Sequence, residues 1–154
     1  MVSQAREDPF PAFNFVVQLV DEDGENRIVA GFSECSGLES TLDVEEYQEG
    51  GVNNRIYKFP STFSFTNITL KHGVTLNDSL RQWHNDLLKG NVKRRNGLII
   101  LLNENREEVL AWKFERGLPV KYTAPTFNAT QSDAAVETLE IAHERLEQFD
   151  IERI

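Results

Sequence analysis

The chain has 154 residues, of which 40% are hydrophobic and 27% are charged. This length and composition suit one folded domain and exclude a wholly disordered protein. The 25 acidic residues outnumber the 16 basic ones and give a formal net charge of −9, which would repel nucleic-acid phosphates and anionic lipids. We therefore expect no specific binding to nucleic acid and no binding to a membrane.

Three segments are predicted along the chain. Residues 1–12 are polar and contain two prolines, which favours an N-terminal arm. One domain is expected over residues 13–149, and residues 150–154 form a short C-terminal tail. The N-terminus has no apolar signal region, so we expect synthesis in the cytoplasm without a signal peptide.

An antiparallel hairpin is predicted at the start of the domain. Every second residue is apolar in the set Phe13, Phe15, Val17 and Leu19, and again in Ile28, Ala30 and Phe32. This period of two is typical of strands with one strongly apolar face. The Asp23-Gly24 pair between the two runs favours a tight turn.

Residues 39–61 are predicted to protrude from the domain as an extended hairpin or loop. The only aliphatic side chains in their first half are Leu42 and Val44, and several carboxylates surround them. A strand there has little apolar surface to bury. The Gly50-Gly51 pair marks the tip, and long excursions of this kind are usually functional or disordered.

A strand and the only predicted helix follow. Phe63 and Phe65 have odd sequence numbers and Ile68 has an even one, so a regular strand would place them on opposite faces. This change predicts a strand with a bulge near Thr66-Asn67. The helix is expected at about residues 77–89, where apolar residues are spaced as on one helix face. Gly90 stands where a left-handed residue would end that helix.

The last third of the chain predicts a central strand and leaves one segment ambiguous. The run from Leu98 to Leu102 is apolar on both faces, which indicates a central strand or one that a partner covers, and a returning strand follows at residues 109–114. Gly117 and Pro119 are expected to end that strand before another short one. Beyond residue 135 the spacing fits both a helix and a strand, and local propensity favours the helix.

Side chains with catalytic chemistry are scarce. His72, His84 and His143 are far apart in sequence without metal-ligand spacing, and Cys35 stands in no nucleophile motif. There is no phosphate-binding loop and no paired-carboxylate motif. We therefore predict no catalytic residue, no metal and no cofactor, and a protein that is not an enzyme.

A dozen short segments, taken together and in order, are similar to one family. They include Asp8-Pro-Phe10, Gly31-Phe-Ser-Glu-Cys-Ser-Gly-Leu-Glu39, Glu46-Tyr-Gln-Glu-Gly-Gly51, Arg94-Arg-Asn96 and Glu137-Thr-Leu-Glu-Ile-Ala-His-Glu144. Over about residues 8–147 the chain resembles the tail tube, or inner tube, proteins of contractile phage tails and extracellular contractile injection systems.

The resemblance implies a mainly antiparallel β-sandwich or barrel-like domain with one flanking helix, assembled as hexameric rings. It also implies that Val136–His143 is a strand, against the local helical propensity. The implied partners are further copies of the chain, the sheath protein, baseplate or tube-initiator and tube-terminator proteins, and cargo in the lumen. The implied location is a phage virion tail or a released or anchored bacterial injection particle.

Candidate contacts between subunits lie in the protruding segment and in basic residues. Subunits with a charge of −9 repel one another, so we expect basic side chains to pair across subunit boundaries. The candidates are Glu46, Tyr47, Gln48, Glu49, Gly50, Gly51, Arg55, Lys58, Lys93, Arg94 and Arg95.

The main hypothesis is a structural subunit of the inner tube, whose stacked rings form a hollow conduit for a protein effector or DNA inside a contractile sheath. One alternative is a tube-initiator or baseplate-adaptor subunit of the same machine. Another, from a different class, is a small-ligand-binding β-domain with aromatic residues around a pocket.

Overall fold

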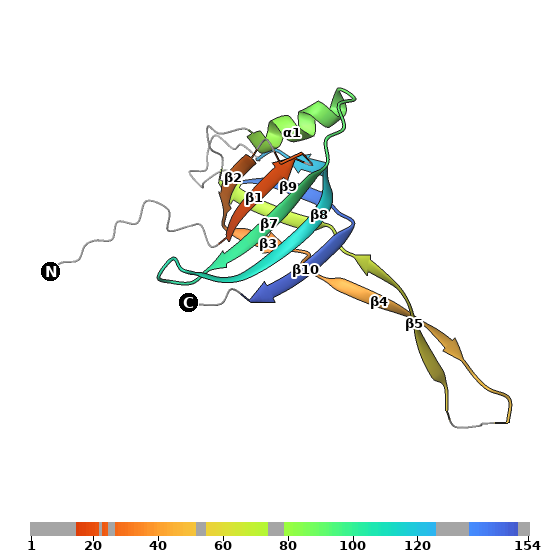
Figure 1. The fold of residues 1–154 in the computed structure, drawn as a ribbon. Helices are drawn as coiled ribbons and strands as arrows, with labels where there is room; N and C mark the ends of the chain where they lie inside the picture. Colours follow the sequence, from red (N-terminus) through yellow and green to blue (C-terminus); the bar gives the residue numbers. More distant parts are fainter. Residues whose placement is uncertain are drawn as a thin grey trace.

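The computed structural model describes residues 15–21, 23–24, 27–51, 55–73, 79–125 and 136–150 (Figure 1). The predicted N-terminal arm and residues 151–154 of the predicted tail lie outside the described residues. The elements in chain order are β1 (Phe15–Asp21), β2 (Arg27–Phe32), β3 (Glu34–Ser36), β4 (Ser40–Tyr47), β5 (Tyr57–Phe65), β6 (Ile68–Gly73), α1 (Ser79–Leu88), β7 (Arg95–Leu102), β8 (Glu108–Thr123), β9 (Val136–Ala142) and β10 (Arg145–Asp150).

The described strands form one large antiparallel sheet and one separate hairpin. The large sheet has the order β2-β1-β7-β8-β9-β6-β3, and β10 also pairs with β8. Only Ser33 separates β2 from β3, and its N–H donates to the carbonyl of Lys71 at 3.0 Å. The first and last strands of the order are therefore continuous in the chain, and the sheet closes along part of its length, while β2 and β10 each keep an edge without a strand partner in the described residues. The predicted antiparallel barrel-like fold with one flanking helix is confirmed.

The core lies inside this closed sheet. It consists of apolar side chains that alternate along the strands, together with two residues of α1: Val17, Leu19, Phe32, Ile68, Leu70, Leu80, Trp83, Ile99, Phe114, Leu139 and Ile141. β7 lies between β1 and β8, and its neighbouring residues Ile99 and Ile100 are both buried although they point to opposite faces. The run that is apolar on both faces is thus a central strand, as predicted.

Local signals placed the first hairpin and the end of the helix correctly. Gly24 has a φ of 78°, and its N–H donates to the carbonyl of Asp21 at 2.8 Å. Gly90 has a φ of 92°, and the next residue, Asn91, donates to the carbonyl of Asp86 at 2.9 Å, which closes the last turn of α1. The described helix is Ser79–Leu88, within the predicted range of 77–89.

The strand expected from the family resemblance at Val136–His143 is confirmed as β9. Its pairing to β8 continues into β10 with nearly the same register, so the two strands lie end to end along one edge of β8. They are interrupted only at His143 and Glu144. β10 itself was not predicted.

Two predictions for strand breaks were wrong. β8 does not end at Gly117 or Pro119 but runs for 16 residues through both. The carbonyl of Pro119 lies 2.7 Å from Nδ1 of His84 on α1, so the backbone there faces the helix and the missing N–H costs no strand hydrogen bond.

The second wrong prediction is the bulged strand through Thr66-Asn67. These residues separate two strands with different partners, because β5 pairs with β4 whereas β6 pairs with β3 and β9.

Arg95 is buried inside the barrel and not on its surface. Its Nε forms an ion pair with Oδ1 of Asp21 at 2.8 Å. Its guanidinium also lies 5.4 Å from the ring centroid of Trp83. Because its charge is engaged within the chain, we do not propose Arg95 as a contact between subunits.

We predict that Gly97→Ala destabilises the fold. A Cβ at this position of β7 would overlap the ring of Phe114, so the free energy of unfolding should fall by about 1–3 kcal/mol. Gly50→Ala is the matched control, because a Cβ there meets nothing within 4 Å, and its effect should stay within about 0.5 kcal/mol. Urea denaturation measures both, and equal midpoints for the two variants would contradict this packing.

Removal of the Arg95 charge should also be costly. Arg95→Met leaves the carboxylate of Asp21 in a site where it is only 11% exposed, so we expect a loss of about 3–5 kcal/mol in urea denaturation. Adding Asp21→Asn should restore part of this loss, because the uncompensated charge is then gone. A double variant that loses the full sum of the two single effects would show that the pair is not coupled.

Candidate assembly interface

The β4–β5 hairpin stands away from the barrel (Figure 1) and forms a two-stranded sheet of its own. Every residue of β4 is exposed. Its strands are Ser40–Tyr47 and Tyr57–Phe65, so the described hairpin reaches Phe65, beyond the predicted range of residues 39–61.

The nominated hairpin residues lie toward its tip. Glu46 is the cross-strand partner of Lys58, and Tyr47 is the partner of Tyr57. The guanidinium of Arg55 lies 5.9 Å from the ring centroid of Tyr57. Gln48, Glu49, Gly50 and Gly51 follow β4, and all four are exposed.

The hairpin exposes several large apolar side chains. Those exposed by more than two fifths are Leu42, Val44, Tyr47, Ile56, Phe59 and Phe63. A lone two-stranded hairpin is at best marginally stable in water, and contiguous exposed apolar patches usually mark interaction sites. These side chains therefore point to a partner surface.

The base of the hairpin is fixed to the barrel. His143 donates from Nε2 to the carbonyl of Thr66 at 3.0 Å, and its ring contacts the rings of Phe65 and Phe114. The hydroxyl of Thr66 donates to Glu39 at 3.1 Å. The direction in which the hairpin leaves the barrel is thus set by side chains from β9–β10 and β8 as well as by its own.

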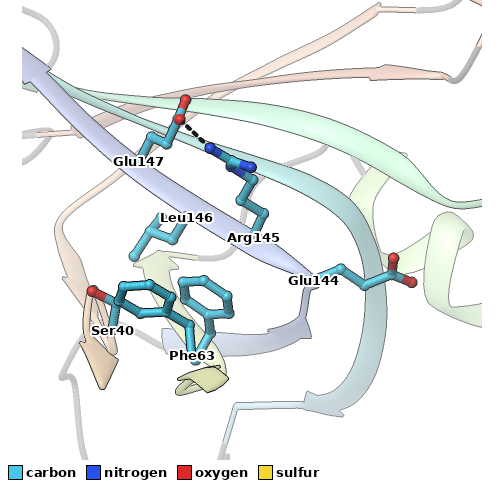
Figure 2. Close-up of a pocket in the computed structure, with 7 residues that line it drawn as sticks. Ser40, Phe63, Glu144, Arg145, Leu146 and Glu147 are labelled. Atoms are coloured by element: carbon cyan, nitrogen blue, oxygen red, sulfur yellow. Dashed lines mark hydrogen bonds and ion pairs between the residues drawn. The ribbon is translucent and has the colours of Figure 1, made fainter. Parts of the chain in front are cut away.

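A groove of about 350 Å³ separates the hairpin base from β10 (Figure 2). Its lining comes from Ser40, Phe63 and Phe65 on the hairpin and from residues 144–147 on the other side. Within the described residues, β10 pairs only with β8. The groove therefore runs beside a strand edge whose backbone groups have no strand partner in the described part of the chain.

Lys93 and Arg94 lie between α1 and β7, at the opposite end of the molecule from the hairpin tip (Figure 1). The carbonyl of Lys93 accepts a hydrogen bond from Nε1 of Trp83 at 2.8 Å, while the residue is exposed. Arg94 lies 3.4 Å from a carboxylate oxygen of Glu144. These two basic residues are close in space to each other but not to the hairpin tip.

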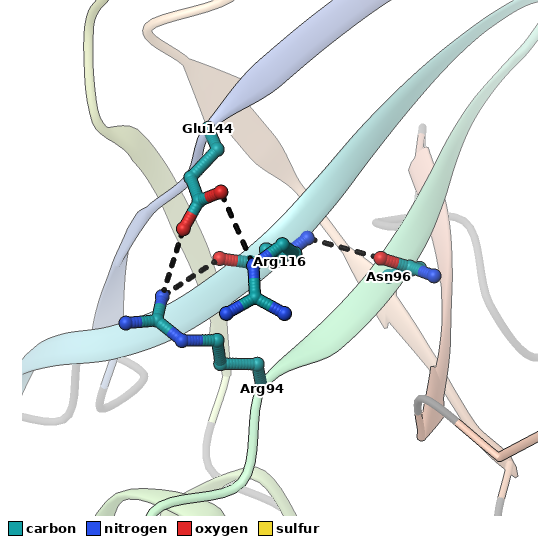
Figure 3. A network of polar contacts seen from close by, with 4 residues as sticks. All are labelled: Arg94, Asn96, Arg116 and Glu144. Carbon is teal, nitrogen blue, oxygen red and sulfur yellow. Dashed lines mark hydrogen bonds and ion pairs between the residues drawn. The ribbon is translucent and has the colours of Figure 1, made fainter.

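Arg94 belongs to a polar network that holds a bend in β8 (Figure 3). Opposite Asn96 of β7, β8 has two residues, Glu115 and Arg116, and Arg116 has a φ of 54°. The N–H of Arg116 donates to Oδ1 of Asn96 at 3.0 Å, and its Nε lies 3.1 Å from Glu144. This bulge turns β8 from β7 toward the helix, and a positive φ at an arginine gave no signal in the sequence.

Nothing in the described residues resembles a reaction centre. Burial raises the pKa of the Cys35 thiol to about 12, so it stays protonated and poorly nucleophilic at neutral pH. No group of three or more His, Cys, Asp or Glu side chains that could hold a metal ion occurs in the part of the chain that the structure describes. Likewise, none of the described helical residues forms a helix with the length and apolarity to cross a bilayer.

Several solved structures resemble this chain over nearly its whole length. One is from the baseplate of the anti-feeding prophage, symmetrised six-fold, with 25% identity, 97% of each chain covered and a TM-score of 0.77. A second is from the sheath–tube complex of the PVC extracellular contractile injection system, with 29% identity, 97% of this chain and 100% of that chain covered and a TM-score of 0.75. The third is from the sheath/tube terminator of PVC, with 31% identity, 94% of this chain and 99% of that chain covered and a TM-score of 0.73.

The sequence itself matches one family model. None of the curated protein sequences matches the chain. The model that describes the T4-like virus tail tube protein gp19 matches residues 11–147, which include all of the barrel strands except the end of β10, together with the hairpin and α1. The chain therefore belongs to the T4-like virus tail tube protein family and is a structural tube subunit.

Proposed function

We propose that copies of this chain close into hexameric rings, and that the rings stack into the hollow inner tube of a contractile injection system. The observation that carries the proposal is a pair of different open edges on one sheet. The strands β2, β1, β7, β8 and β10 lie side by side, and in the described residues β2 pairs only with β1 and β10 only with β8.

Unequal edges favour a ring. If β10 of one copy lies against β2 of the next, the contact is heterologous, and such contacts give closed rings when the rotation between copies closes. Edge pairing also satisfies backbone groups that would otherwise invite aggregation. Six copies are supported by the similar protein in the six-fold symmetrised baseplate.

The protruding hairpin is the proposed arm to a neighbouring copy. It carries Asp43, Glu45, Glu46 and Glu49 against only Arg55 and Lys58, so an acidic surface reaches outward. Lys93 and Arg94 at the far end of the molecule offer a basic surface for such an arm. With Arg95 removed, the proposed basic contacts are Arg55, Lys58, Lys93 and Arg94.

The proposed partners are a sheath protein around the tube, a baseplate or initiator protein at one end and a terminator at the other. The similar proteins in sheath–tube, baseplate and terminator complexes support this list.

We propose that the tube carries cargo, has no catalytic activity and forms part of a released or anchored injection particle or a phage tail. An initiator or adaptor subunit is the second candidate, because one similar protein lies in a baseplate.

The first test is assembly of the purified chain. Negative-stain electron microscopy and light scattering over a range of protein and salt concentrations should show six-fold rings or hollow filaments. Assembly should increase with salt because screening reduces the repulsion between acidic subunits. An initiator subunit would give rings that do not lengthen, and a chain that stays monomeric in every condition would contradict the proposal.

A charge reversal tests the basic contacts. The double variant Lys93→Glu, Arg94→Glu should reduce filament formation at low salt, because the arm then meets like charge. Lys121→Glu, at an exposed position of β8, is the matched control and should assemble like the unchanged chain. The thermal midpoint should fall little, since the exposed Arg94–Glu144 pair is worth at most about 1 kcal/mol. Equal assembly of the double variant and the control would remove Lys93 and Arg94 from the interface.

A further inference from the structure

The register of the β4–β5 hairpin changes in its middle. Leu42 pairs with Phe63, but Val44 pairs with Pro60. One residue of β4, Asp43, therefore lies opposite two residues of β5, which are residues 61 and 62. β5 thus contains a β-bulge, which adds one residue to that strand only.

The bulge divides the exposed apolar residues between two faces of the ribbon. Cross-strand partners share a face and successive residues alternate. On the barrel side of the bulge, one face carries the proximal cluster, which we define as Leu42, Phe63 and Phe65. On the tip side, the other face carries the distal cluster, which we define as Tyr47, Tyr57 and Phe59.

Without the bulge the arrangement would be different. Tyr57, Phe59, Phe63 and Phe65 all have odd numbers, so an uninterrupted β5 would align them in one stripe on one face. The extra residue reverses the parity of the strand and separates the stripe into two. The sequence therefore contains one aromatic stripe, and the structure contains two clusters on opposite faces.

Both clusters are available for contacts. Phe63 is 63% exposed and stacks on Phe65 with ring centroids 6.5 Å apart, and the proximal cluster borders the groove beside the open edge of β10. In the distal cluster Tyr47 is 56% and Phe59 51% exposed. Glu45, the cross-strand partner of Phe59, lies on the same face, and the guanidinium of Arg55 lies over the ring of Tyr57, so the distal surface carries a carboxylate and a guanidinium beside its aromatic rings.

We infer that the hairpin is bivalent and that the β5 bulge makes it so: the proximal cluster contacts one neighbouring copy of the chain, and the distal cluster contacts a different copy. This inference rests on the proposed function. The proximal cluster is continuous with the groove at β10, so its occupant is the copy that pairs with that edge within the ring. The distal cluster faces the opposite way on the protruding half of the hairpin, and its occupant is a copy in the adjacent ring. The carboxylate of Glu45 beside the distal cluster is the proposed partner for Lys93 and Arg94 of that copy.

Two variants remove the bulge in opposite ways and separate its consequences. Insertion of one threonine between Asp43 and Val44 gives β4 the matching extra residue. It restores an uninterrupted β5 parity and moves the distal cluster onto the face of the proximal cluster. Deletion of Thr62 also removes the bulge, but it leaves the two clusters on opposite faces. The deletion is therefore the matched control for the insertion.

The readout is the distribution of protein among monomers, rings and tubes, measured by electron microscopy and light scattering. We expect the insertion variant to form rings but to lose stacking by about tenfold or more, the loss expected when aromatic anchors leave an interface. The deletion variant should form both rings and tubes. If the insertion variant stacks like the unchanged chain, or if both variants lose stacking equally, the bivalent arrangement is wrong. If the unchanged chain forms no rings at all, the proposed function itself fails, and this inference fails with it.

Side-chain substitutions provide an independent test that does not alter strand length. The double variant Tyr47→Ser, Phe59→Ser should form rings that do not stack, whereas Phe63→Ser should impair the rings. Leu88→Ser on α1 removes a still more exposed apolar side chain outside the hairpin and should change neither. Loss of rings in the distal variant, or normal rings in the Phe63 variant, would overturn the assignment of the two clusters.

Discussion

The backbone groups at the edge of a β-sheet must find partners, and this constraint decides both the fold of the chain and its use. β2 pairs with β1, and after Ser33 the chain continues as β3, which pairs with β6. This change of partner at Ser33 joins the two ends of the strand order. β9 and β10 share a nearly common register on β8, but only β9 has a second partner. The barrel is thus closed along part of its length and open at β2 and β10 in the described residues. The open part offers unpaired backbone groups to which a neighbouring subunit can add a strand.

The places where strands change partners are held by side chains and not by turn sequences. Asn96 and Glu144 support the positive φ of Arg116, where β8 bends away from β7. His143 ties the β9–β10 break to the base of the hairpin through the carbonyl of Thr66. A positive φ at a residue with a side chain costs about 1–3 kcal/mol, so such a bend persists only when its surroundings determine it. These contacts connect the open edge, the groove and the hairpin into one continuous surface.

The parts of the fold that could be predicted depend on local patterns. Alternation placed β1 and β2, a run apolar on both faces placed the centre of β7, and Gly24 and Gly90 marked their turns because both require a positive φ. The strand at β9 needed the family resemblance, since its spacing also fits a helix. The family also gave the tube function, which no motif in the chain carries.

The features that were missed depend on long-range pairing. Arg95 was read as part of a basic cluster because it follows Lys93 and Arg94, although it shares the inward parity of Gly97 and Ile99, and Asp21 shares that of Val17 and Leu19. That common parity was the signal that could have revealed the buried pair. The bulge in β5 had no such signal, because its aromatic residues keep a regular spacing in the sequence. Only the register against β4 shows that they face two ways.

Amide hydrogen exchange on assembled and monomeric protein tests the central claim most directly, since exchange reports which backbone N–H groups gain partners. The account predicts that the alternate amides of residues 27–32 and 145–150 that face away from β1 and β8 become protected in rings, while the amides of β1 and β7, paired on both sides already, change little. Unchanged exchange at both edges in protein that has formed rings would show that the open edges of the sheet do not build the tube.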